Sequence, residues 1–216
     1  MAPTARGAEL TALGDAARER LRHVHLAREE ALPCCRDTIR ACGLAIRAVH
    51  RRMADDVDAR LDEAAASLRR AQQALAPFPQ LAATGFLHDA EKEFAEAHLT
   101  VALVAGSPLP TDSDLSVGLA AWLNGLAEAA SELRRHLLDR LRGGEIERGE
   151  QLLVGMEDVY DLLVTVDYPD AITGGLRRTT DALRAVVERS RSDVTTTVLQ
   201  ARLQRAIEEA AGRATP

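Results

Sequence analysis

Apolar residues recur at the three- and four-residue spacing of an α-helix along almost the whole chain. A half-buried strand would instead alternate apolar and polar residues, and no sustained alternation is present. The one β-branched run, 194–198, lies inside a helical pattern. Because a single periodicity governs the chain, its apolar faces can be buried only by packing helix against helix. The sequence therefore predicts an all-α fold.

Proline, glycine and turn residues interrupt this pattern at six places, and each joint is short. Repeats of solenoid length are absent, so a single compact domain is favoured. We expect a disordered N-terminus over 1–8, one helical domain over 9–211, and a flexible C-terminal tail over 212–216. The seven predicted helices span 7–32, 33–52, 55–76, 80–105, 113–142, 145–166 and 170–211.

Composition narrows the classes of function. Of 216 residues 46% are hydrophobic, enough for a sizeable core, but only 3% are aromatic, which leaves few platforms for stacking on bases. A net charge of −6 argues against a uniformly basic nucleic-acid surface, although local basic patches can persist. Of the 27 basic residues only Lys92 is a lysine, so arginine would make nearly all phosphate contacts.

The three cysteines and the N-terminus point to a cytoplasmic protein. Cys34, Cys35 and Cys42 lie on one predicted helix and have no second cysteine pair or paired histidines at zinc spacing, so we expect reduced packing residues. The first residues form no apolar signal segment, and no apolar run approaches the roughly 18 residues of a membrane span. We expect no membrane partner.

Two pairs of glutamates have the spacing that places both carboxylates on one face of a helix. Glu93 and Glu96 are three residues apart, and Glu128 and Glu132 are four apart. Mg²⁺ and Mn²⁺ prefer oxygen ligands, and such ions activate water and stabilise phosphoryl displacement. The pairs predict either a divalent metal site or two solvated acidic faces, since glutamate is also common on exposed helices.

The position of each pair on its helix bears on this choice. Glu93 falls close to the apolar stripe of its helix, so we expect it to be partly buried. Glu128 and Glu132 continue a stripe that begins with Ala121 and Gly125, and small residues permit another helix to approach closely. Carboxylates at such a contact repel each other unless a proton or cation compensates them. This strengthens the metal interpretation.

Arginines at seven-residue steps mark the last predicted helix, and a stripe of this kind can follow the phosphates of a nucleic acid. The alternative is a solvated helix face, because acidic residues are interleaved with them. The histidines near the acidic pairs form no Glu-x-x-His, which a di-iron site would need, and are read as packing or surface residues. The candidate nucleic-acid-binding residues are Arg177, Arg178, Arg184, Arg191, Arg134 and Arg135.

Several segments resemble the translin family: RDTIRACGLAIRAVHR (36–51), KEFAEA (92–97), GLAEAASELRR (125–135), LRGGEIERGEQLL (141–153) and the stretch 156–195. In the family's order they cover about residues 30–200. The resemblance implies a seven-helix all-α subunit that assembles into a closed, roughly octameric homo-oligomer and binds single-stranded RNA and ssDNA. In the branch of translin-associated factor X it also implies Mg²⁺-dependent cleavage of RNA.

The resemblance also implies roles for the four acids. The catalytic branch takes its acids from a Glu-x-x-Glu and an Asp-x-x-x-Glu, and Glu93, Glu96, Glu128 and Glu132 fall on those positions. They are therefore expected to be the catalytic residues and the ligands of Mg²⁺ or Mn²⁺. Glu128 departs from the pattern, because its side chain is one methylene longer than the family's aspartate.

The expected function is a metal-dependent endoribonuclease that acts on single-stranded RNA inside an oligomeric shell. One alternative is a non-catalytic binder of RNA and ssDNA, of the translin kind. The other is an all-α nucleotide pyrophosphohydrolase of the MazG type, which also pairs acidic doublets around Mg²⁺. The second doublet of that class resembles Glu-x-x-Asp, whereas here the spacing is four residues and both residues are glutamate.

Overall fold

The computed structural model describes residues 4–51, 53–82 and 84–213. Every regular element within these residues is a helix, which confirms the all-α prediction. None of the described helices combines the length and hydropathy that crossing a bilayer requires. The elements are α1 (Ala5–Arg51), α2 (Ala54–Leu75), α3 (Pro79–Ala82), α4 (Phe86–Ala105), α5 (Asp112–Leu115), α6 (Leu119–Arg142), α7 (Ile146–Val164), α8 (Asp170–Thr173) and α9 (Leu176–Arg213).

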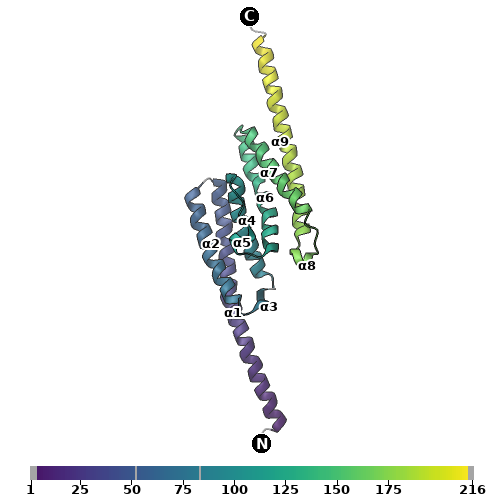
Figure 1. Ribbon diagram of the computed structural model, residues 1–216. Helices are drawn as coiled ribbons and strands as arrows, with labels where there is room; N and C mark the ends of the chain where they lie inside the picture. Colours follow the sequence, from purple (N-terminus) through teal and green to yellow (C-terminus); the bar gives the residue numbers. More distant parts are fainter. Residues whose placement is uncertain (1–3, 52, 83, 214–216) are drawn as a thin grey trace.

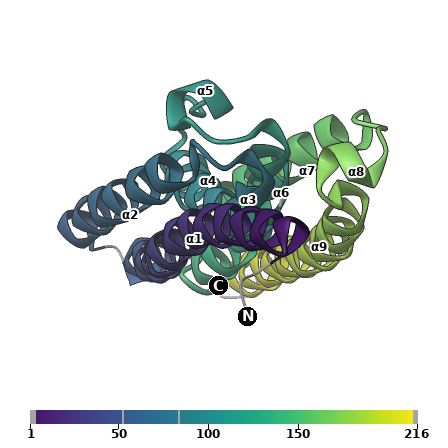
Figure 2. The same ribbon diagram turned by 90° about the horizontal axis from the view of Figure 1, so that it is seen from below.

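The six long helices lie side by side (Figure 1). α2 packs on α1, α1 on α4 and α4 on α6, while α7 and α9 pack on the other side of α6 and on each other. Viewed from below, α1 and α2 lie on one side of α6 and α7 to α9 on the other (Figure 2). The N-terminal part of α1 and the C-terminal part of α9 project from opposite ends of this bundle (Figure 1).

The predicted helix boundary at Pro33 is wrong, because α1 runs through it without interruption. Proline removes one backbone hydrogen bond, which frees the carbonyl of Glu29 four residues earlier. Pro33 and Glu29 are both exposed, so water can hydrate that carbonyl. Ala31 and Cys34, on the opposite side, are buried and keep the helix packed. The predicted helices 7–32 and 33–52 are therefore one helix, and position 52 lies outside the described residues.

Three other predicted helices are split near their N-termini by residues with positive φ. Gly85 (φ 96°) separates α3 from α4, and Gly174 and Gly175 (φ 62° and 85°) separate α8 from α9. Thr111 caps α5 by accepting a hydrogen bond from the backbone of Asp114, and Ser116 (φ 54°) then ends that turn. Backbone in the left-handed region cannot continue an α-helix. The longer part of each predicted helix, which carries the candidate site residues, is retained.

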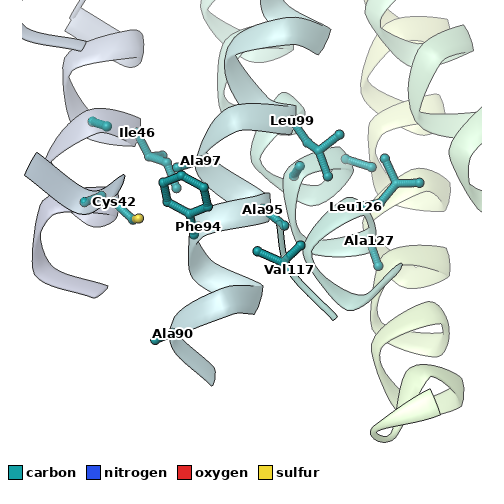
Figure 3. Close-up of a cluster of buried hydrophobic side chains, with 14 of the residues drawn as sticks. Cys42, Ile46, Ala90, Phe94, Ala95, Ala97, Leu99, Val117, Leu126 and Ala127 are labelled. Carbon is teal, nitrogen blue, oxygen red and sulfur yellow. The ribbon is translucent and has the colours of Figure 1, made fainter. Parts of the chain in front are cut away.

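The core around α4 joins three helices (Figure 3). Phe94 and Leu99 of α4 belong to one buried cluster with Cys42 and Ile46 of α1 and Leu126 of α6. Many other members of this cluster are alanines, which let the helix axes come close. The cysteines at 34, 35 and 42 are buried and unbridged, as predicted. α4 is thus held firmly on two sides, and it carries the first acidic pair.

Candidate metal centre

The contact between α4 and α6 is unusually close at Gly125, as the stripe of small residues predicted. A Cβ atom at this position would lie 2.8 Å from the backbone oxygen of Lys92 and 2.9 Å from both the Cβ of Ala95 and the backbone nitrogen of Glu96. The two helix backbones therefore touch here without a side chain between them. Glu128, about one turn further along α6, is brought opposite the acidic pair of α4.

Three of the four predicted acids form one group, which we call the acid trio: Glu93, Glu96 and Glu128. Each contributes a carboxylate oxygen, and these three oxygens lie within 4.8 Å of one another. Glu96 is 8% exposed, whereas the side chains of Glu93 and Glu128 are 27% and 33% exposed. The acid trio therefore has a buried base at Glu96 and an opening toward solvent between Glu93 and Glu128.

Burial and mutual repulsion shift two acids of the trio, Glu93 and Glu96, toward their protonated forms. Burial, together with the charges of Glu93, Glu128 and Glu132, raises the pKa of Glu96 to about 9. Burial also raises the pKa of Glu93, and this outweighs the opposing effect of the nearby Lys92 ammonium. In the absence of a bound cation, Glu96 holds a proton at neutral pH.

Lys92 places a positive charge at the opening of the trio. Its Nζ donates hydrogen bonds to Oε1 and Oε2 of Glu128, at 2.8 and 2.7 Å, and lies 3.3 Å from Oε1 of Glu93. Burial lowers the pKa of Lys92, but the hydrogen bond and charge of Glu128 outweigh it and the net shift is upward. Lys92 is the one lysine of the chain, but no sequence pattern indicates its role.

Glu132 lies outside the acid trio, although its charge contributes to the raised pKa of Glu96. Its Oε2 accepts a hydrogen bond from Nε2 of His50, at 2.9 Å, and the His50 side chain is only 3% exposed. This hydrogen bond lowers the pKa of Glu132 despite the opposing effect of burial. Sequence reasoning missed His50, because 82 residues separate the partners and no spacing rule connects them.

The chemistry of the acid trio fits a hard divalent cation. Mg²⁺–oxygen distances of about 2.0–2.1 Å put ligands on opposite sides of the ion about 4 Å apart. Oxygens within 4.8 Å of one another need only small side-chain rotations to reach this spacing. A cation would also offset the burial and the repulsion that raise the pKa of Glu96. The longer side chain of Glu128, the departure from the family pattern, still reaches the trio.

The candidate arginines of α9 are exposed and paired with acids. Their side chains are 57–78% exposed, and exposed pairs of this kind contribute little stability and exchange readily. The pairs are Arg177–Asp167 at 3.3 Å, Arg184–Glu188 at 3.0 Å and Arg191–Glu157 at 2.7 Å. Arg178 is exposed beside Arg177.

The two candidate arginines of α6 lie in different surroundings. Arg134 is only 25% exposed and donates to Asp193, at 2.7 Å, and to Ser190, at 3.1 Å. It thereby ties α6 to α9. Arg135 is exposed, and its positive charge contributes to the lowered pKa of Glu132. Among the candidate arginines, Arg135 is therefore the one whose charge acts on a predicted catalytic acid, Glu132.

Comparison with solved structures decides the family. The structure of AfC3PO, from Archaeoglobus, in complex with duplex RNA is 31% identical to this chain, with a TM-score of 0.80, and the match covers 88% of this chain and 97% of that one. This chain belongs to the C3PO family, which is the translin family. A second crystal structure of AfC3PO matches equally well, with a TM-score of 0.80 over 98% of that chain.

Two further comparisons give one structure with the same fold and one sequence relative. Apo-NeC3PO shares the fold, with a TM-score of 0.76 over 85% of this chain and 96% of that one, at 17% identity. The uncharacterized protein MJ0175 of Methanocaldococcus jannaschii is 29% identical over 181 residues, which are 82% of this chain and 79% of that protein. No family model matches the chain. The resemblance noted in the sequence is thus confirmed by structures of C3PO proteins.

Proposed function

We propose that this chain is a metal-dependent endoribonuclease whose acid trio holds Mg²⁺ or Mn²⁺. The observation that carries the proposal is the convergence of Glu93, Glu96 and Glu128, from two helices, within 4.8 Å. Support comes from the C3PO relative that was solved with duplex RNA. A divalent ion supplies a Lewis acid for the scissile phosphate and lowers the pKa of a bound water.

The four acids would take different roles, according to the burial and hydrogen bonding of each. Glu96, at the buried base, would exchange its proton for a metal contact, while Glu93 and Glu128 would be ligands at the open side. Glu132 stays ionised because His50 donates a hydrogen bond to it. It would accept a proton during hydrolysis, as a general base in the ionised form must. The four predicted acids therefore keep catalytic roles in the proposal, with Glu132 acting from beside the trio.

Phosphate binding is assigned to the exposed arginines of α9, with Arg135 close to the acids. Each α9 arginine would exchange a solvated ion pair for a phosphate oxygen, at a small cost. We keep single-stranded RNA as the predicted substrate and ssDNA as a further ligand. Because the relative was solved with duplex RNA, the test includes both single-stranded and double-stranded RNA.

Cleavage of end-labelled RNA by the full chain, with Mg²⁺ or Mn²⁺ against EDTA, tests the proposal. We expect metal-dependent cutting that falls by about 100-fold or more in Glu93→Gln and in Glu128→Gln, since each variant removes one charged ligand. Exposed Glu30→Gln removes the same charge elsewhere and should cut normally. Single strands and duplexes of one sequence are compared in parallel.

Cutting that persists in both trio variants would refute the proposed site. RNA binding without cutting by the unsubstituted chain would instead make it a non-catalytic binder, the alternative from the sequence.

We further propose that the chain acts as a homo-oligomer joined through its projecting helix ends. The part of α1 before Val24 and the end of α9 are almost entirely exposed, yet both carry apolar side chains at helical spacing. Apolar surface of this kind usually marks an interface. The residues are Leu10, Leu13 and Leu21 on α1, and Leu199, Leu203 and Ile207 on α9, which are 57–67% exposed.

The double variant Leu21→Glu/Leu203→Glu is expected to shift the protein from a multiple of the 23.3 kDa chain mass to the monomer, because a buried charge opposes association. Light scattering after gel filtration measures the mass. Ile172→Glu, at a similarly exposed position outside both ends, is the control and should leave the mass unchanged. An unchanged mass in the double variant would exclude these ends as the interface.

A further inference from the structure

Lys92 is the one lysine among 27 basic residues, and it lies at the opening of the acid trio. Its side chain is 21% exposed and reaches from α4 across to α6. Both oxygens of Glu128 accept hydrogen bonds from its Nζ, and Oε1 of Glu93 lies 3.3 Å away. The ammonium therefore neutralises the two carboxylates that form the open side of the trio.

A divalent cation at the trio needs the same carboxylate oxygens. Glu128 directs both of its oxygens at Lys92, so a metal ion that binds either oxygen must share it with the ammonium. An ammonium and a divalent ion on the same carboxylates would also repel each other strongly at such short range. Binding of the ion therefore disfavours the present position of Lys92.

Lysine is suited to leave this position, whereas arginine is not. The ammonium is a compact charge on a flexible stem with rotatable donors, so it can give up one acceptor and find another. A guanidinium would grip a carboxylate through two parallel hydrogen bonds in fixed geometry. In a chain that otherwise uses arginine throughout, the one lysine stands at the opening of the acid trio.

We propose that Lys92 is an exchangeable cation: it bridges Glu128 and Glu93 in the metal-free protein, and moves to the RNA phosphate when a divalent ion takes over these carboxylates. The second half rests on the proposed nuclease function. Lys92 directly precedes Glu93 on α4, so the released ammonium stays within reach of the trio on its open side. A phosphate must approach from that side, and a lysine charge there stabilises the charge that develops during cleavage.

Titration of the full chain with Mn²⁺ alone, by calorimetry and without RNA, tests the exchange. Lys92→Met removes the charge and the donors, so Mn²⁺ should bind about 10- to 100-fold more tightly. This factor corresponds to the free energy of the charge-assisted hydrogen bonds that the ion no longer has to break. Lys92→Arg should weaken Mn²⁺ binding. Lys92→Gln, which keeps a neutral donor, gives a second uncharged variant if the methionine variant is poorly folded.

Cleavage at saturating Mn²⁺ provides the second readout. In Lys92→Met we expect kcat to fall by about 100-fold while Mn²⁺ binds more tightly, a combination that a merely structural lysine would not produce. Mn²⁺ affinity that is unchanged within twofold, or weaker, in both uncharged variants would overturn the exchange. If the unsubstituted chain binds Mn²⁺ but cuts no RNA, the nuclease function fails, together with the phosphate role of Lys92, while the affinity comparison still decides the exchange.

Discussion

Gly125→Ala is expected to lower the free energy of unfolding by about 2 to 3 kcal/mol, as overpacking of a tight core contact does. The added methyl group would lie within 2.9 Å of two backbone atoms of α4 and of the Ala95 Cβ. Backbone atoms cannot move aside unless a whole helix shifts. Urea denaturation measures the effect. The expected sign is notable, because alanine in place of glycine normally stabilises the interior of a helix.

The control for this prediction is Gly155→Ala. Gly155 is inside α7, and a Cβ there would meet nothing within 4 Å. This variant should gain about 0.5 to 1 kcal/mol from helix propensity alone. Equal effects of the two substitutions would disprove the close contact of α4 with α6. In Gly125→Ala the displaced α6 should also carry Glu128 away from the acid trio, so Mn²⁺ binding should weaken as well.

Glu96→Gln is expected to stabilise the metal-free protein at alkaline pH and to leave its stability unchanged at pH 4. The folded pKa of Glu96 is about 9, above its usual 4.5. Below pH 4.5 both folded and unfolded chains hold the proton. As pH rises from there to about 9, only the unfolded chain releases it, so the carboxyl progressively destabilises the folded state. The neutral amide resembles the protonated carboxyl and escapes this loss.

At pH 8 the expected gain is at least about 2 kcal/mol, since each pKa unit corresponds to about 1.4 kcal/mol. This raises the midpoint of thermal unfolding by roughly 4 °C or more. Saturating Mn²⁺ should narrow this difference, because the unsubstituted chain gains about 2.7 kcal/mol at 100 times the Kd and the variant has lost a ligand. Thermal scans from pH 4 to 9, with and without Mn²⁺, measure both effects. A difference between the two proteins that is the same at every pH would contradict the assignment, and Glu30→Gln is the control.

Helical periodicity accounts for what could be predicted of this site. The spacing of Glu93 and Glu96 and the stripe of small residues ending at Glu128 are properties of single helices, so they follow from 3.6 residues per turn. The contact of α4 with α6 then depends on Gly125, which the sequence also marks. Local rules fail at Pro33, where proline is expected to end a helix. The missing hydrogen bond lies on the exposed side of α1, so water can replace it and the helix continues.

The partners of the acids could not be predicted by such rules. Lys92 reaches Glu128 over 36 residues of sequence and His50 reaches Glu132 over 82, and both pairings depend on side-chain conformations at helix contacts. Ser116, in the left-handed region, is likewise not marked by its residue type, because serine rarely takes that conformation. Periodicity determines which face of a helix is buried, but not which polar groups meet across the contact.

The continuity of α1 through Pro33 makes a single rod of 47 residues, about 70 Å long at 1.5 Å per residue. One end carries the exposed leucines of the projecting segment, and the other end carries His50 against Glu132. A partner that held the projecting end would therefore also fix the axial position and rotation of the His50 ring beside Glu132. The proposed oligomer interface and the alignment of the site are therefore coupled through α1.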